Sequence, residues 1–298
     1  MTKQTRSFLV DIERRFKNAN IQSPRFDAEV IVAFILKVER KNLGLINDIS
    51  DDQEREIEKL VEKRVRRIPL QHLVGEQGFR YLNLKVGKGV FIPRPETEIL
   101  VEAVIRYLKE IANERKKVID FCAGSGAIAL AIATECANVD CFAIEKSEEA
   151  FSFLKENYQK YEEEIKSKNS TLTLVNQDVK GEVQEIINLN ESFDVVVSNP
   201  PYIPEKMIPK EIEVKDHEPE IALYGGKDGL EIVRVVIEKG AMLLKPGGFI
   251  GIEHADVQGN INDEASVPFL LQQNGNFKNI QDRKDFNGLP RFSMGINK

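Results

Sequence analysis

The sequence predicts an α/β protein, with a doubly wound, mostly parallel seven-stranded sheet that follows a small N-terminal helical domain. Residues 1–74 carry apolar residues at helical spacing, whereas strand-like and helical segments alternate from residue 94 onward. An apolar strand at 117–121 also runs through a turn of small residues directly into an apolar helix. Such alternation is typical of a parallel sheet covered by helices.

Residues 1–74 are expected to form three helices. The second begins at Ser23 and Pro24, with the serine as N-cap. The third begins at Ser50, which forms a capping box with Gln53, and it ends at Pro69. Apolar residues mark the three helices in turn: Phe8, Leu9, Ile12, Phe16; Phe26, Val30, Ile31, Phe34, Ile35; Ile57, Leu60, Val61, Val65, Ile68. This domain is expected to serve packing or docking.

Residues 75–93 alternate and are punctuated by glycines, which predicts a β-hairpin or an extended linker. A helix with apolar residues from Ile99 to Leu108 follows. Only a short turn separates the last two expected strands, so we predict that they pair antiparallel. The expected strands are 117–121, 139–144, 171–176, 193–198, 247–253, 277–282 and 291–296.

Composition limits the classes of function. The net charge of -6 and the pI near 5.4 argue against a protein that binds nucleic acid by bulk electrostatics, although "KRVRR" at 63–67 is a local positive run. The 3 cysteines form no C-x-x-C pair and the 3 histidines lie far apart, so we expect no disulfide framework and no metal site. The charged N-terminus resembles neither a signal peptide nor a membrane span, which favours the cytoplasm.

The turn after the strand at 117–121 is the first candidate binding site. Gly124 and Gly126 let the backbone approach a ligand and aim the N–H groups of a helix N-terminus at it. Ala129 completes a G-x-G-x-x-A spacing, which is compatible with a dinucleotide fingerprint. Glu145 ends the next strand, where it can accept hydrogen bonds from two ribose hydroxyls. NAD and S-adenosylmethionine both fit this pattern.

Two details favour S-adenosylmethionine. Asp120 sits inside the strand end just before the turn, where it can face the amino-acid part of that cofactor. Cys122 occupies the place of the first glycine, which pyrophosphate binding would want, and we interpret it as a small buried hydrophobe. Asp178 follows the third strand, where such folds contact adenine, and Val179 beside it can pack on the ring.

The stretch "VVVSNPPY" ends the fourth strand and carries the second candidate site. In a doubly wound sheet, ligands bind outside the carboxyl ends of the strands. The Asn199 side-chain carbonyl and the Pro200 backbone carbonyl are two acceptors that can hold one planar NH2 group. Tyr202 offers a flat face for stacking.

This pair of acceptors suits methyl transfer to a delocalised nitrogen. Two hydrogen bonds to the NH2 protons draw charge toward the nitrogen, so that its lone pair can point at a methyl group held about 3–3.5 Å away. A preoriented site then matters more than a strong base, and the sequence offers no His or Lys base nearby.

On these motifs the chain resembles the release-factor glutamine methyltransferases, once called HemK-like. The resemblance covers nearly the whole chain, and "PRPETE" and "DGL" are more specific than the turn. The matching segments are "FIPRPETEILVE" (91–102), "DFCAGSGAIALAIA" (120–133), "FDVVVSNPPYI" (193–203), "EPEIALYGGKDGLEIVR" (218–234), "LLKPGGFIGIEH" (243–254) and "DFNGLPRF" (285–292).

The resemblance implies a Rossmann-like class I methyltransferase domain at 94–298, with S-adenosylmethionine as cofactor and residues 1–74 as a substrate-docking domain. It implies that the substrate is the glutamine of the Gly-Gly-Gln motif in class-1 peptide chain release factors, methylated on its side-chain amide. The implied cofactor contacts are Cys122, Ala123, Gly124, Ser125, Gly126, Glu145, Val179 and Asn199. The implied substrate pocket holds Asn199, Pro200, Pro201 and Tyr202, with Pro93, Arg94 and Glu96 lining the same cleft.

Three alternatives remain. A similar N-P-P-Y motif occurs in enzymes that methylate exocyclic amines of adenine or guanine, which would require a basic channel. A non-catalytic adaptor would leave the intact turn and motif unexplained. An NAD oxidoreductase would require an acid or base on the hydride side, and the sequence presents none.

Overall fold

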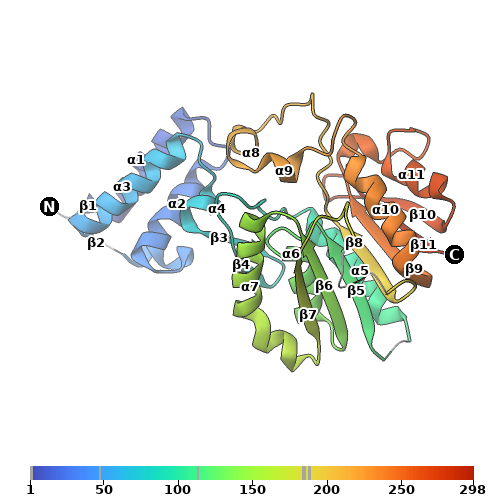
Figure 1. Ribbon diagram of the computed structural model, residues 1–298. Helices are drawn as coiled ribbons and strands as arrows, with labels where there is room; N and C mark the ends of the chain where they lie inside the picture. The colour runs from blue at the N-terminus through green and yellow to red at the C-terminus, as the bar shows by residue number, and fades with distance from the viewer. Residues whose placement is uncertain (1–2, 47, 113, 183–185, 187–188) are drawn as a thin grey trace. The chain divides into compact units, whose positions relative to one another are not determined.

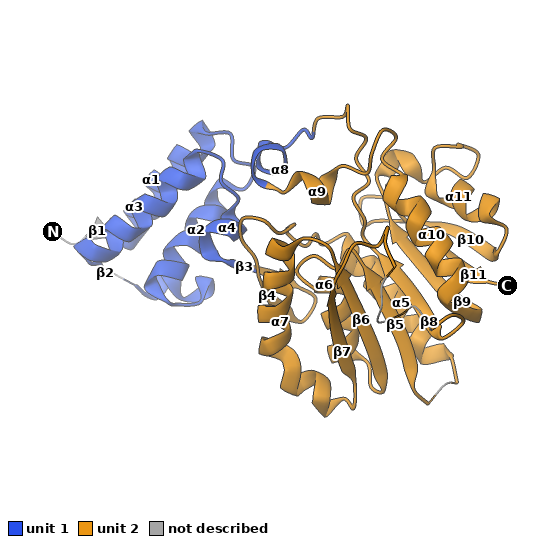
Figure 2. Ribbon diagram, viewed as in Figure 1, with its two compact units in different colours: residues 1–76, 209–217 blue, residues 77–208, 218–298 orange. Residues whose placement is uncertain are grey.

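The computed structural model describes residues 3–46, 48–112, 114–182, 186 and 189–298. The chain forms two compact units (Figure 2). Unit 1 comprises residues 1–76 and 209–217, and unit 2 comprises residues 77–208 and 218–298. The short segment 209–217 thus belongs to unit 1 although both of its neighbours in sequence belong to unit 2.

Unit 1 is helical (Figure 1). The four residues Phe8, Leu9, Ile12 and Phe16 are all buried, as their helical spacing predicts. The elements of unit 1 are β1 (Lys3–Gln4), α1 (Thr5–Asn18), α2 (Pro24–Leu36), the 3-10 helix η1 (Arg40–Leu45), β2 (Asp48–Ile49), α3 (Asp51–Val65), α4 (Leu70–Val74) and α8 (Ile212–His217).

The predicted starts of the second and third helices are confirmed, whereas the predicted end of the third is not. Ser50 and Gln53 form the expected capping box, in which the Gln53 N–H donates to the Ser50 hydroxyl at 3.3 Å. Ser23 precedes α2 as predicted, but its side chain accepts no capping hydrogen bond. The predicted end of the third helix is wrong, because α3 stops at Val65 and Pro69 instead caps the next helix, α4.

A buried ionic cluster ties the segment 209–217 to the rest of unit 1. The Arg64 side chain is only 7% exposed, and its Nε lies 2.7 Å from Asp27 while its Nη1 lies 2.9 Å from Glu213. Arg67 Nη2 approaches the other oxygen of Glu213 at 2.6 Å. Two of the arginines in "KRVRR" are therefore occupied inside unit 1, which removes them from any exposed basic patch.

Unit 2 contains a seven-stranded sheet in the order β10-β11-β9-β8-β5-β6-β7, counted over the described residues (Figure 1). The five strands β7, β6, β5, β8 and β9 pair in parallel, and β11 and β10 are antiparallel, as predicted. The strands are β5 (Lys116–Phe121), β6 (Val139–Glu145), β7 (Thr171–Asn176), β8 (Phe193–Ser198), β9 (Leu244–Glu253), β10 (Phe277–Lys284) and β11 (Pro290–Asn297).

Helices cover both faces of this sheet, which confirms the doubly wound arrangement. Alternate strand residues point to opposite faces, so Val118 and Ile119 belong to different cores. The first core contains α5, α6 and α7, and the second contains α10 and α11. The helices are α5 (Thr97–Glu110), α6 (Ala127–Glu135), α7 (Glu148–Ser167), α9 (Glu220–Leu223), α10 (Glu231–Leu243), η3 (Asp256–Gln258) and α11 (Val267–Asn274).

Residues 75–93 contain β3 (Glu76–Phe79) and β4 (Leu82–Lys85), which pair as a two-stranded sheet. Among the described residues, no helix combines the length and apolarity that a membrane crossing needs.

Candidate active site

The direction of winding reverses between β5 and β8. From β5 the chain adds β6 and β7 on one side, and β8 and β9 lie on the other. Phe121 pairs with Ser198 at the carboxyl ends of these two strands, and the Ser198 hydroxyl donates to the Phe121 carbonyl at 2.6 Å. The turn 122–126 and the motif 199–202 therefore begin at neighbouring strand ends, where ligands bind in such folds.

The turn 122–126 has an unusual backbone. Cys122, Gly124 and Gly126 have φ of 61°, 58° and 87°, a region that favours glycine. Cys122 is thus a strained non-glycine residue, because the side chain of an L-residue crowds the backbone there. Burial raises the pKa of the Cys122 thiol, with the nearby Glu145 carboxylate adding to the rise, so the group stays protonated. The interpretation of Cys122 as a hydrophobe rather than a nucleophile agrees with this environment.

Glu145, at the end of β6, holds the turn from one side. One carboxylate oxygen accepts from the Gly124 N–H at 2.8 Å and the other accepts from the Ser147 N–H at 2.7 Å. Burial raises the pKa of Glu145, while these backbone hydrogen bonds oppose the rise. Each carboxylate oxygen has a second lone pair, so the side chain retains capacity for further donors.

Asp120 is the second-last residue of β5, just before the turn. Its side chain is buried, and one oxygen accepts from the Ala129 N–H of α6 at 3.2 Å. The other oxygen has no hydrogen-bond partner among the described residues. Burial raises the pKa of Asp120 well above its usual value, which the Ala129 N–H partly opposes. A buried carboxylate oxygen without a protein partner indicates a place for an external donor.

Asp178 and Val179 follow β7. Asp178 forms an ion pair with Lys146 at 2.8 Å and accepts from the Lys180 N–H at 2.9 Å, so its carboxylate has partners already. Val179 is buried in the second core. The structure brings these residues to the same edge as the turn, since β6 and β7 are parallel neighbours.

Asn199 follows β8 and is half-buried. Its amide Nδ2 lies 3.3 Å from the hydroxyl oxygen of Thr97, the first residue of α5. Pro200 and Pro201 are buried, and burial raises the pKa of the neighbouring Tyr202 phenol. The backbone carbonyl of Tyr202 accepts from Gln258 at 3.1 Å, which holds the end of the motif.

A glycine-rich segment lies directly behind the motif. A Cβ at Gly229 would lie 2.2 Å from the Tyr202 carbonyl oxygen, and one at Gly225 would lie 2.4 Å from that of Pro201. Main-chain hydrogen bonds join Ile203 to Leu223 and Gly225 at 2.8 and 2.9 Å. The specificity of the "YGGKDGL" segment thus has a physical reason, because only glycine permits this close backbone contact.

Arg94 and Glu96, predicted to line the cleft, have different surroundings. Arg94 forms an ion pair with the buried Glu218 at 2.5 Å and lies over the Phe91 ring at 5.1 Å. It therefore ties "PRPETE" to the segment that supports the motif. Glu96 precedes α5 as its N-cap residue, and its charge acts on both Tyr202 and Glu253.

Sequence reasoning missed Thr97, Glu253 and Arg291, which approach the motif from α5, β9 and β11. Burial raises the pKa of Glu253 to about 7, which hydrogen bonds from Thr97 and Asn199 and the charge of Arg291 oppose. One Glu253 oxygen has no hydrogen-bond partner among the described residues. A charged residue inside the apolar stretch "FIGIEH" was the available signal.

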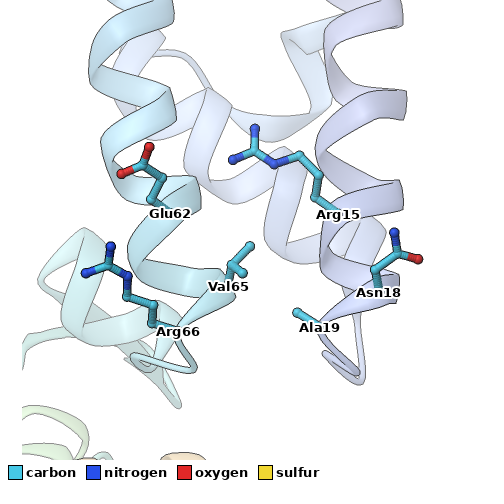
Figure 3. A pocket seen from close by; sticks show the side chains of 6 residues that line it. All are labelled: Arg15, Asn18, Ala19, Glu62, Val65 and Arg66. Carbon is cyan, nitrogen blue, oxygen red and sulfur yellow. The ribbon is translucent and has the colours of Figure 1, made fainter.

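Unit 1 has a cavity of about 520 Å³ between α1 and α3 (Figure 3). Arg15, Asn18, Ala19, Glu62, Val65 and Arg66 line it. None of the predicted site residues belongs to this group.

Two family models match consecutive parts of the chain, and curated relatives match nearly all of it. The model of the PrmC N-terminal domain family matches residues 8–75, and the model described as conserved hypothetical protein 95 matches residues 72–221. The chain is 37% identical to the release factor glutamine methyltransferase of Streptomyces coelicolor, over 94% of this chain and 93% of that protein. It is 36% identical to the protein of the same name from Clostridium acetobutylicum, over 94% of each.

Among solved structures, a methyltransferase from Pyrococcus furiosus is 19% identical and has a TM-score of 0.49, covering 82% of this chain and 98% of that one.

Proposed function

The chain belongs to the release factor glutamine methyltransferases and is a methyltransferase, and we propose that it methylates the side-chain amide of the Gly-Gly-Gln glutamine in class-1 release factors. The names of its relatives support the choice of substrate. The observation that carries the proposal is the adjacency of Phe121 and Ser198, which brings the glycine-containing turn and the Asn-Pro-Pro-Tyr motif to neighbouring strand ends.

We propose S-adenosylmethionine as the cofactor, because the buried polar groups suit it. The unpartnered oxygen of Asp120 can accept from an ammonium group. Glu145 retains lone pairs for ribose hydroxyls, and Ser125 is buried at the same turn. In this assignment Cys122, Ala123, Gly124 and Gly126 surround the cofactor's amino-acid end, and Asp178 and Val179 lie toward adenine. S-adenosylmethionine, when bound, supplies a methyl group on a positively charged sulfur.

The motif residues then prepare the amide nitrogen. Asn199 Oδ1 and the Pro200 carbonyl oxygen accept hydrogen bonds from its two N–H groups. These hydrogen bonds draw charge to the nitrogen and aim its lone pair. Tyr202 stacks on the planar amide, and Pro201 keeps the backbone rigid. Arg94 and Glu96 line the substrate cleft in this proposal, and the ion pair with Glu218 holds Arg94 in place. The reaction is proposed to occur in the cytoplasm, where release factors work.

The test uses labelled S-adenosylmethionine and two forms of one release factor, with the Gly-Gly-Gln glutamine intact or changed to alanine. We expect label only in the intact form. Equal labelling of both forms would refute the glutamine assignment.

Methylation of exocyclic amines in nucleic acid is the competing assignment. It requires a basic channel. Two arginines of the run "KRVRR" do not provide one, because Arg64 forms an ion pair with Asp27 and Arg67 forms one with Glu213. Protein-free DNA or RNA in the same assay is expected to remain unlabelled. Efficient labelling of it, with steep salt dependence, would favour the alternative.

A further inference from the structure

Two buried residues, Glu253 and Thr97, lie behind Asn199 and form a hydrogen-bonded group with it. Glu253 is the last residue of β9, and Ile252 before it pairs with Ser198, so Glu253 lies beside the start of the motif. Its side chain is buried, 1% exposed for the whole residue. Thr97 is also buried, and its hydroxyl oxygen lies 3.3 Å from Asn199 Nδ2. Both Thr97 and Asn199 hydrogen-bond to the Glu253 carboxylate.

Which group donates and which accepts in these hydrogen bonds follows from their chemistry. An ionised carboxylate can only accept hydrogen bonds, so the Thr97 hydroxyl must donate to Glu253. The Thr97 oxygen then offers a lone pair, and Asn199 can satisfy it only with its NH2 group. The opposite side of the amide, Oδ1, is thereby turned away from Thr97 and can accept from a ligand.

We propose that Glu253, which accepts from Asn199 directly and is also linked to it through Thr97, is a positioning residue that fixes the amide of Asn199 with its oxygen toward the substrate nitrogen. The inference rests on the proposed function for the identity of the substrate. A donated hydrogen bond at Nδ2 also makes Oδ1 a stronger acceptor, because hydrogen bonds in a chain polarise one another.

Protonation of Glu253 would remove the direction. A carboxylic acid can donate to Thr97, the Thr97 hydroxyl can then donate to Asn199, and the amide can rotate to present NH2 toward the substrate NH2. Two donors facing each other form no hydrogen bond. The titratable groups around Glu253 are Arg291 from β11, Glu96 at the start of α5 and the neutral Tyr202 phenol of the motif.

The sign of the pH dependence follows. With the Glu253 pKa at about 7, the ionised form dominates above that pH, and turnover is expected to fall as the pH drops through it. A residue with a purely structural role would change stability without creating this acidic limb in kcat.

The test compares Glu253→Gln with the wild type on an intact release factor. We expect kcat to fall about 10–100-fold, as for other residues that orient a catalytic group, and the acidic limb to vanish. Cofactor affinity is expected to stay unchanged. Asp194→Asn serves as the control, since Asp194 is a buried carboxylate at the opposite end of β8.

A second pair of variants isolates the hydroxyl. Thr97→Val is expected to lower kcat, whereas Thr97→Ser restores most of it. Thr134→Val, which removes a buried hydroxyl bound to the Leu130 carbonyl of α6, is the control. Independently of activity, NMR titration of the Glu253 carboxyl carbon is expected to show a higher pKa in Thr97→Val, because the carboxylate has lost a donor.

The inference is overturned if Glu253→Gln keeps the wild-type kcat or its acidic limb, or if Thr97→Val leaves the Glu253 pKa unchanged. The two proposals fail separately. If the wild type labels no release factor, the proposed function falls, whereas labelling with an indifferent Glu253→Gln removes only the positioning role.

Discussion

Buried carboxylates in the two units have different surroundings. In unit 1, Asp27 is held by the Arg64 guanidinium at 2.7 Å, and Arg64 also binds Glu213. In unit 2, Asp120 and Glu253 each retain an oxygen without a hydrogen-bond partner among the described residues. The first arrangement satisfies its own charges, whereas the second leaves acceptors for something else. This difference separates a structural cluster from a binding site.

Breaking the buried ionic cluster of Asp27, Arg64 and Glu213 in unit 1 should produce the largest effect on stability. Arg64→Met leaves Asp27 and Glu213 without their buried partner, so we expect a loss of about 3–5 kcal/mol in unfolding free energy. Urea unfolding measures it, and adding Asp27→Asn should recover part of the loss. Arg55→Met, which removes an exposed pair with Asp52, is the control and should change little. A small effect of Arg64→Met would show that the cluster is not structural.

A substitution in the candidate active site should lower the rate of methylation rather than the stability of the protein. We expect Asn199→Ala to lower single-turnover methylation about 10²–10³-fold, because an oriented acceptor for the reacting nitrogen is lost. Calorimetry should show cofactor binding only modestly weaker. Asn260→Ala, in an exposed loop, is the control. Activity near that of the wild type would contradict the polarising role of Asn199.

The unpartnered oxygen of Asp120 allows a direct comparison with a paired carboxylate. Asp120→Asn should weaken S-adenosylmethionine binding about tenfold, since a charge-assisted hydrogen bond is lost, yet leave stability unchanged or higher. Asp140→Asn, which disrupts the ion pair with Arg115 at 2.5 Å, should affect stability slightly and binding not at all. If both variants lose stability alone, Asp120 is a structural residue.

Cys122 offers the smallest effect. Because its φ is 61°, Cys122→Gly should raise the unfolding free energy by up to about 1 kcal/mol, after the entropy cost of glycine is deducted. Cys136→Gly, at a φ of -108°, should destabilise the protein instead. Thermal unfolding of the two variants distinguishes the outcomes. A destabilised Cys122→Gly would mean that the side chain's packing outweighs its backbone strain.

The sequence predicted the sheet closely and the supports of the site poorly. Strands such as 171–176 and 193–198 match to the residue, because apolar runs bounded by turn residues are local signals. The prediction that the third helix ends at Pro69 was wrong, because α3 ends at Val65. The ion pair of Arg94 with Glu218 was not predicted, because the two residues are 124 positions apart and no local pattern shows such a pairing.

The order of the elements, the glycines of the turn and the chemistry of Asn-Pro-Pro-Tyr could be read from local sequence, because they depend on neighbouring residues. The positions of Thr97 and Glu253 behind Asn199, and of residues 209–217 in unit 1 through Glu213, follow from the folded chain alone. The physical reason is that hydrogen bonds and ion pairs act across space between distant strands and helices. Their partners become visible only when the chain is folded.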